Sequence, residues 1–212
     1  MKKAGLLGCV GVLVLIAIIA FAVGGSGYNK LNGKSQNVDG KWAQVQTQYQ
    51  RRADLIPQLV GTVKGAANFE QSTLEGVVQA RASATQVKID PSHAPTDPAQ
   101  LAAYQKAQDS LSGSLSRLLV TVEKYPELKA TQGFQTLQAQ VEGTENRIAV
   151  SRGDFNTAAV DYNTARTNFP AVLYAGLMGF KEKPPFKADD SAQSAPKVDF
   201  GSFSSTPAPT AK

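Results

Sequence analysis

The stretch from Leu101 to Val122 reads LAAYQKAQDSLSGSLSRLLVTV, and it decides the fold class. Its larger side chains recur at alternating spacings of three and four residues, which is the period of one face of an α-helix. The positions on this face are Leu101, Tyr104, Gln108, Leu111, Leu115, Leu118 and Val122. A narrow seam of this coiled-coil type predicts that the helix packs against other helices.

Two further segments carry the same spacing. One runs from Trp42 to Val87, and Pro57 inside it predicts a kink or a break at Ile56. The other runs from Phe134 to Phe169 and predicts a helix about 50 Å long. No useful run alternates with a period of two. The expected fold is therefore all-α, an antiparallel bundle of three long helices and one short helix.

Helix-breaking residues predict the boundaries of the bundle segments. Residues 89–98 contain three prolines and predict a loop, after which Asp97 can cap a helix that has Pro98 at its first position. Tyr125-Pro126-Glu127 predicts the next turn. Residues 171–180 are short and apolar, and they predict the short helix at one end of the bundle.

The N-terminal apolar run covers residues 4–25 and contains no charged side chain. A helix of about 22 residues is roughly 33 Å long, close to the ~30 Å hydrocarbon core of a bilayer. We therefore expect a short flank at residues 1–3 and a single transmembrane helix at residues 4–25, with the lipid bilayer as its partner.

Two alternatives for the N-terminal run stay open. Lys2 and Lys3 before the run, with Ala20-Phe21-Ala22 as a cleavage site, fit a secretory signal peptide, although the apolar run is longer than usual for one. Leu6-Leu7-Gly8-Cys9 resembles a lipobox, although most of the apolar run follows Cys9. As the one cysteine of the chain, Cys9 excludes a disulfide within it.

Composition divides the remainder of the chain. Glycines and polar residues predict a juxtamembrane linker at residues 26–37, after which Asp39 is a candidate helix cap. Residues 38–180 form the expected bundle. Residues 181–212 are rich in Pro, Ser and Ala, and they predict a flexible C-terminal tail that is either disordered or loosely laid on the bundle, especially beyond Gly201.

The charge pattern argues against nucleic acid as a partner. The formal net charge is +5, and charges of both signs are interspersed along the chain without a basic block. Lys2 and Lys3 favour a cytoplasmic N-terminus, whereas Lys30, Lys34 and Lys41 on the other flank favour the reverse. The two counts nearly cancel, and because Lys2 and Lys3 are closest to the membrane we slightly favour an extracytoplasmic bundle.

No residue pattern indicates catalysis, a cofactor or a metal. His93 is the one histidine, and it lies between prolines in the predicted loop. A metal site needs three or four ligands, and no cysteine or second histidine is available near it. We expect no catalytic, cofactor-binding or metal-binding residues, and His93 is interpreted as a solvated loop residue.

Arg51, Arg52 and Asp54 flank the predicted kink, where they have two interpretations. They can bind a partner or lipid headgroups, or they can be structural. Arg52 falls on the apolar face, and a buried charge is costly unless it is paired. We favour the structural interpretation, with Glu145 or Asp161 as the partner of Arg52.

Glu142, Glu145, Asn146 and Arg147 form a polar cluster in the third long segment. The two glutamates are three residues apart and share a helix face, so an acid pair of the glycosidase type is conceivable. We favour polar contacts that set the register of the bundle.

Glycines inside helical stretches cost about 1 kcal/mol each, which predicts that they allow close helix approach. In the bundle these are Gly61, Gly65, Gly143 and Gly153. In the N-terminal run they are Gly5, Gly8 and Gly11, where small residues permit packing between spans. A homo-oligomer in the membrane plane is therefore an open alternative.

Several motifs together resemble the LemA family. They are Gln50–Val60, Thr62–Gly65, Tyr125–Ala130, Glu142–Ala149, Tyr162-Asn163, Phe169-Pro170, Gly176–Phe180 and Ala195–Phe200. The resemblance implies a bacterial membrane protein with one N-terminal span and an antiparallel bundle of about four helices. It also implies no assigned enzymatic activity and frequent association with other membrane proteins.

The sequence thus predicts a single-pass protein of the bacterial cell inner membrane. We expect a helical scaffold or adaptor that acts through protein–protein contacts with other membrane proteins, without catalysis. Two alternatives are a membrane-bound or secreted enzyme with an unrecognised site and a homo-oligomeric membrane assembly protein.

Overall fold

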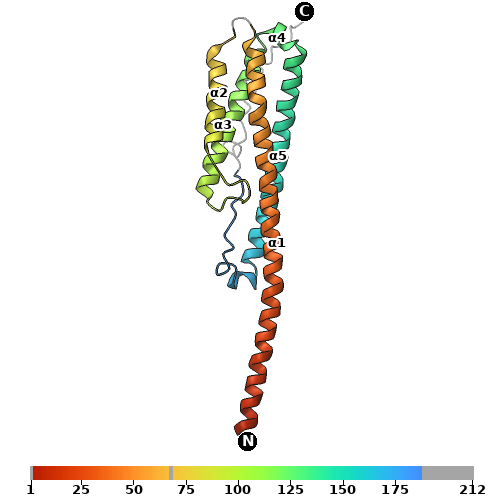
Figure 1. The fold of residues 1–212 in the computed structure, drawn as a ribbon, viewed down its shortest axis with the longest axis vertical. Helices are drawn as coiled ribbons and strands as arrows, with labels where there is room; N and C mark the ends of the chain where they lie inside the picture. The colour runs from red at the N-terminus through yellow and green to blue at the C-terminus, as the bar shows by residue number, and fades with distance from the viewer. Residues whose placement is uncertain (1, 67–68, 188–212) are drawn as a thin grey trace, which may run out of the picture.

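Residues 2–66 and 69–187 are described by the computed structural model of the chain, with side chains from residue 25 onward. Their elements are α1 (Lys2–Lys64), α2 (Gln71–Gln86), α3 (Pro98–Val122), α4 (Pro126–Lys129), α5 (Gln132–Thr167) and the 3₁₀ turn η1 (Ala171–Leu173). The predicted all-α class is confirmed for this part of the chain. Four long helices run alternately up and down, and α1 extends past the end of the bundle (Figure 1).

The helix seams form the interior of the bundle. All seven seam positions of the stretch 101–122 are buried in α3. Helix α1 packs along α5, and α2 packs along α3. These two helix pairs together form the bundle (Figure 1). The helix start predicted at Asp97 and Pro98 is confirmed: the Asp97 side chain accepts a hydrogen bond from the Ala99 N–H, and Pro98 is the first residue of α3.

The linker predicted at residues 26–37 is wrong, because α1 continues through it without a break. Leu31 and Val38 are buried at helical spacing ahead of Trp42, so the seam begins before the predicted linker ends. Burial of such side chains contributes roughly 1.5–3 kcal/mol each, which exceeds the ~1 kcal/mol cost of a helical glycine. Asp39 lies inside the helix and caps nothing.

Of the two alternatives predicted at Pro57, a kink or a break at Ile56, the break is wrong. Helix α1 passes through Pro57 and ends at Lys64, and α2 begins as a separate fourth long helix at Gln71. Proline has no N–H to donate to the carbonyl four residues earlier, which here belongs to Ala53. The Arg81 Nε of α2 donates to that carbonyl oxygen at 2.9 Å, so the missing helix bond is replaced from a neighbouring helix.

This replacement yields a first prediction. Arg81→Met should lower the free energy of unfolding by about 1–2 kcal/mol, because a buried carbonyl loses a charged donor. In a Pro57→Ala background the new Ala N–H satisfies the same carbonyl, so the cost of Arg81→Met should shrink. Equilibrium denaturation of the four proteins measures this coupling, and equal costs in both backgrounds would refute it.

The predicted reason for the bundle glycines is wrong. A Cβ built at Gly61, Gly143 or Gly153 would meet no atom within 4 Å, and one at Gly65, in the turn after α1, would meet only the nearby Thr62 carbonyl oxygen at 3.4 Å. These glycines are thus not needed for close helix approach.

Two expectations concern the C-terminal end. The short helix predicted at residues 171–180 is only the three-residue η1 followed by turns. Of the two alternatives for the tail predicted from residue 181, disorder is wrong for residues 181–187, which lie extended along the bundle (Figure 1). We call residues 181–187 the strap.

The membrane predictions fall largely outside the described side chains. Among helices with side chains described, within residues 25–66 and 69–187, none combines the length and the apolarity needed to cross a membrane. Residues 4–24 of the predicted span, with the cleavage site, the lipobox and the first three glycines, lie outside that part. The motif Ala195–Phe200 also lies outside it.

Candidate functional site

The bundle core consists of two apolar clusters separated by a polar layer. One cluster surrounds Trp42 and Phe155, and the other surrounds Leu59 and Phe134. Between them lie buried polar side chains contributed by three different helices: Arg52, Gln108 and Thr144. A polar layer of this kind fixes which residues of adjacent helices face each other, because a shifted register leaves buried polar groups unpaired.

Arg52 is the centre of this layer, and only 1% of it is exposed. Its Nη1 donates to Glu145 Oε1 at 2.8 Å and to Ser112 Oγ at 2.5 Å. Its Nη2 donates to the side-chain and main-chain oxygens of Gln108, at 2.5 and 3.2 Å. The Tyr49 ring lies 5.2 Å from the guanidinium carbon. The predicted pairing of Arg52 with Glu145 is confirmed.

The other members of the two predicted clusters point to solvent. Asp54 is exposed and accepts a hydrogen bond from Gln50, and Glu142 is exposed and accepts one from Gln138. Arg51 and Arg147 are exposed and line one shallow hollow of about 460 Å³. The structure therefore separates Glu142 from Glu145 and assigns only Glu145 to the polar layer.

His93 lies in the loop between α2 and α3, where its side chain is 75% exposed. Its Nδ1 lies 2.8 Å from Asp90 Oδ2. This contact with His93 and the Ser92 N–H hold the pKa of Asp90 below its usual value. Within the described residues no group of three or more His, Cys, Asp or Glu side chains could hold a metal ion.

The strap is held by two asparagines of α5: Asn163 belongs to the Tyr162-Asn163 motif quoted above, and neither asparagine was predicted to hold the strap. Asn163 donates to the Lys183 carbonyl at 2.8 Å and accepts from the Lys183 N–H at 3.1 Å. Asn156 pairs with the main chain of Phe186 in the same way, at 3.2 and 2.8 Å. The two asparagines are seven residues apart, which brings them to one face of α5.

Two strap side chains enter the bundle. Lys183 Nζ donates to Asp39 Oδ1 at 2.7 Å and to the Ser35 carbonyl at 3.1 Å. Phe186 is 5% exposed and packs on the rings of Trp42 and Phe155, with centroid distances of 6.1 and 5.4 Å. An isolated aromatic residue after two prolines was the available sequence signal for this contact.

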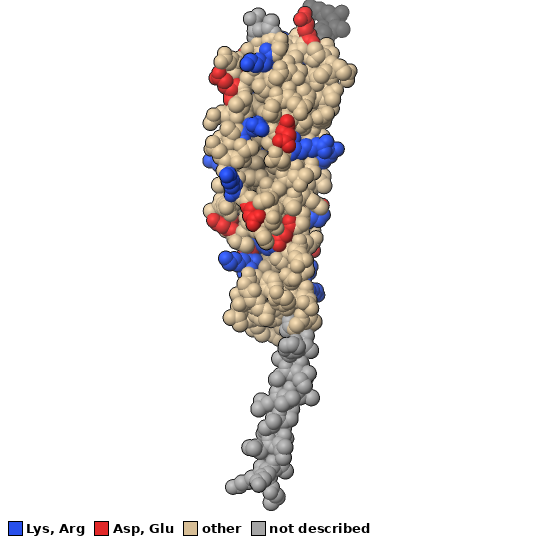
Figure 2. All heavy atoms as spheres, viewed as in Figure 1, with Lys and Arg blue, Asp and Glu red and all other residues tan. Residues whose placement is uncertain are grey.

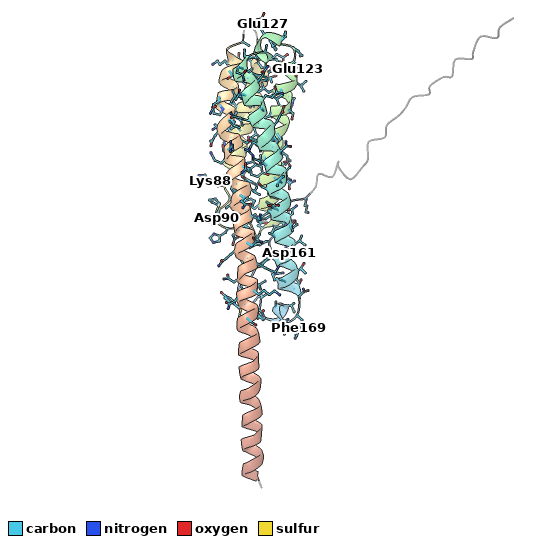
Figure 3. All side chains as sticks on the ribbon, turned by 90° about the vertical axis from the view of Figure 1, so that its right-hand side faces the viewer. Lys88, Asp90, Glu123, Glu127, Asp161 and Phe169 are labelled. Carbon is cyan, nitrogen blue, oxygen red and sulfur yellow. The ribbon has the colours of Figure 1, made fainter. Side chains whose placement is uncertain are left out.

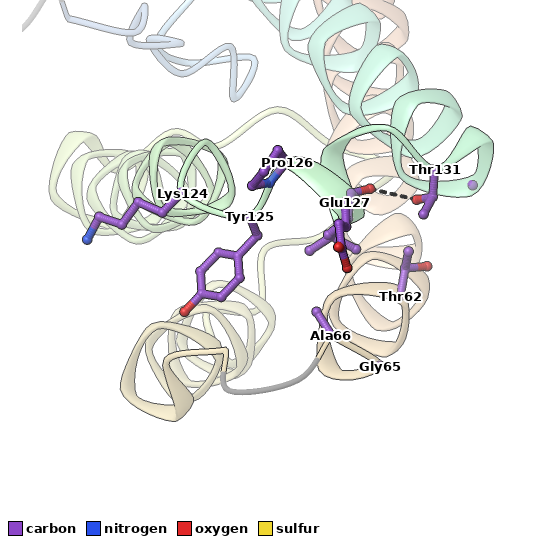
Figure 4. A pocket seen from close by; sticks show the side chains of 10 residues that line it. Thr62, Gly65, Ala66, Lys124, Tyr125, Pro126, Glu127 and Thr131 are labelled. Carbon is purple, nitrogen blue, oxygen red and sulfur yellow. Dashed lines mark hydrogen bonds between the residues drawn. The ribbon is translucent and has the colours of Figure 1, made fainter.

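A cavity of about 710 Å³ opens where α1 ends and α5 begins (Figure 4). Thr62 of α1 and Ala66, just after α1, line it, and its titratable lining side chains are Lys124, Tyr125 and Glu127. Lys124 forms an exposed ion pair with Glu70 at 3.4 Å. The lining of this cavity is therefore partly apolar and partly polar.

Tyrosine burial leads to a second prediction. The Tyr104 hydroxyl donates to Gln46 Oε1 at 2.9 Å, and burial raises the pKa of Tyr104 to about 12. An unfolded tyrosine has a pKa of about 10, so the unfolded chain loses this proton first and stability falls as the pH rises from about 10 to 12. The loss should reach about 2 kcal/mol and diminish in Tyr104→Phe, whereas Tyr28→Phe serves as the exposed control. Denaturation followed by Trp42 fluorescence on both sides of this window measures the effect.

Fold and polar layer together define the class of protein: an antiparallel bundle of long helices, tied internally by a buried ion pair and closed by a C-terminal strap. The sequence matches the LemA family over residues 41–200, and the chain belongs to that family.

Three relatives illustrate the similarity. The magnetosome proteins MamQ 1 and MamQ 2 of Paramagnetospirillum magneticum are each 25% identical over 84% of this chain and 70% of their own length. The protein LemA of Metamycoplasma hominis is 25% identical over 64% of this chain and 58% of its own length.

Proposed function

We propose that the protein is a membrane-anchored helical scaffold that acts through contacts with other membrane proteins, without catalysis. The observation that carries this proposal is the continuity of α1, which joins the apolar run at residues 4–25 to the buried seam of the bundle without a linker. A bundle attached in this way moves with its anchor as one rigid rod, because no flexible joint separates the two. A scaffold that presents fixed surfaces beside a membrane needs that property.

The use of the buried charges supports the same proposal. Arg52 forms an ion pair with Glu145, and Lys183 forms one with Asp39. Both pairs therefore hold parts of the bundle together. Exposed apolar side chains on the outer helix faces, such as Val150 and Val160 of α5, remain for protein contacts.

Fractionation and site-specific crosslinking test the proposal. Full-length protein should stay in the membrane pellet after alkaline extraction. A photo-reactive residue at Val150 or Val160 should form adducts with other membrane proteins, whereas one at buried Leu115 should not. Release into the soluble fraction, or adducts only with further copies of the chain, would overturn the scaffold proposal.

A further inference from the structure

One end of the bundle exposes a group of large apolar side chains. They belong to residues 169–180, which we call the basal loop: Phe169 is 81% exposed, Leu173 73% and Leu177 92%. Val172 and Met178 in the same loop are about half exposed. Exposed apolar side chains that gather in one place mark a surface that contacts a partner or a membrane.

The basal loop lies beside the first described turns of α1. The rings of Phe180 and Tyr28 are 5.4 Å apart, and a Cβ built at Gly27 would lie 2.1 Å from the Tyr174 hydroxyl. A side chain at residue 27 would therefore require the Tyr174 ring to move. Phe169 lies at the same end of the bundle, where α1 leaves it (Figure 3). The loop is therefore held level with residues 27–28, directly after the apolar run at residues 4–25.

Charge around the basal loop has the pattern of a membrane interface. On the face shown in Figure 2, the bundle end next to the grey segment lacks coloured charged side chains. The charged residues of the adjoining stretches 25–34 and 164–182 are Lys30, Lys34, Arg166 and Lys181, with Glu182 as the one acid. Tyrosines and basic side chains favour the headgroup level of a bilayer, where basic residues meet anionic lipids.

The described chain leads away from this apolar surface. After Phe180 the strap runs along the bundle, and the Lys187 carbonyl accepts a hydrogen bond from Gln105 of α3 at 2.8 Å. The segment adjoining the loop is instead the apolar run that precedes α1's bundle portion (Figure 1). The bilayer expected around that run is the surface nearest to the loop.

We propose that the basal loop inserts Phe169, Leu173 and Leu177 into the interfacial layer of the same bilayer that holds residues 4–25. This inference rests on the proposed membrane anchor. A single span leaves the bundle free to rotate about the helix axis and to change its tilt. A second attachment beside it sets which faces of the bundle point along the membrane, and so which faces partners can reach.

Fluorescence in vesicles tests the insertion on the full chain. Single cysteines replace Leu177 or Leu173 in a Cys9→Ser background and carry an environment-sensitive fluorophore. Val120→Cys is the control. Val120 is 69% exposed but lies near the C-terminal end of α3, at the end of the bundle away from the basal loop. Vesicles contain phosphatidylglycerol and phosphatidylethanolamine, with or without bromine on the acyl chains. Flotation of the vesicles measures whether the protein is attached to the membrane, independently of the fluorescence.

We expect the fluorophore at Leu177 and Leu173 to be quenched by brominated lipid and protected from aqueous iodide, with the reverse at Val120. Flotation with iodide quenching at Leu177 would overturn the insertion and leave the anchor intact. Protection from iodide without bromolipid quenching would show that protein covers the loop, either a second copy or residues 188–212, and would also overturn it. Failure to float would refute the anchor itself.

Discussion

Glu145→Ala is expected to lower the free energy of unfolding by about 2–3 kcal/mol. The substitution leaves the Arg52 guanidinium, which is 1% exposed, without its counter-charge in the bundle interior. Removing one partner of a fully buried ion pair typically costs about 3–5 kcal/mol. The Glu145 side chain is 35% exposed, which reduces the expected cost below that range. Trp42, the one tryptophan, is fully buried and reports unfolding by fluorescence.

Two comparisons make this prediction specific to the buried charge. Glu142→Ala, one helical turn away and exposed, should change stability by less than about 0.5 kcal/mol. Arg52→Met should cost less than Glu145→Ala, because water can reach the remaining carboxylate. Adding Arg52→Met to Glu145→Ala should therefore recover stability. If Glu142→Ala and Glu145→Ala were equally costly, the polar layer would have no special role.

Much of the bundle was predictable because its signals are local and periodic. The seam of α3 was read directly from spacing, and every one of its positions is buried. The pairing of Arg52 followed from a single physical requirement, since a charge on an apolar face needs a partner of opposite sign. Glu145 and Asp161 were the two candidates, and the helix register selects Glu145.

The wrong boundaries came from local rules that distant residues override. Glycines at residues 24–33 indicate a linker only if nothing packs there, but Leu31 and Val38 are buried by the rest of the bundle. Pro57 predicts a break only if the Ala53 carbonyl is left without a hydrogen-bond donor, but Arg81 donates to it. Neither compensation follows from the composition of the segment itself.

The strap was missed because an extended segment has no helical or alternating period. Its contacts are formed with Asn156 and Asn163, which are distant in the sequence and look like ordinary surface residues of α5. A proline-rich composition predicts flexibility when no partner is known. Here side-chain amides supply the partners that a neighbouring strand would otherwise provide.

Phe186→Ala is expected to have the largest effect of any strap substitution, a loss of about 3–4 kcal/mol. Phe186 is 5% exposed between Trp42, Phe155 and the guanidinium of Arg152, and replacing a buried phenylalanine by alanine removes its transfer energy and leaves a cavity. The change should also alter Trp42 fluorescence in the folded protein. Trypsin should cleave faster after Lys181, because the strap backbone detaches more often.

The matched control for this prediction is Phe169→Ala. Both residues are phenylalanines of the C-terminal region, but Phe169 is 81% exposed, so its loss in detergent should change stability and Trp42 fluorescence little. Asn163→Ala should fall between the two, at about 1–2 kcal/mol, because it removes two hydrogen bonds and leaves a partly buried backbone unpaired. Equal stability and equal cleavage rates for Phe186→Ala and Phe169→Ala would mean that the strap only rests on the bundle. The predicted order instead makes residues 181–187 part of the core, so that a truncation before Lys181 destabilises the fold.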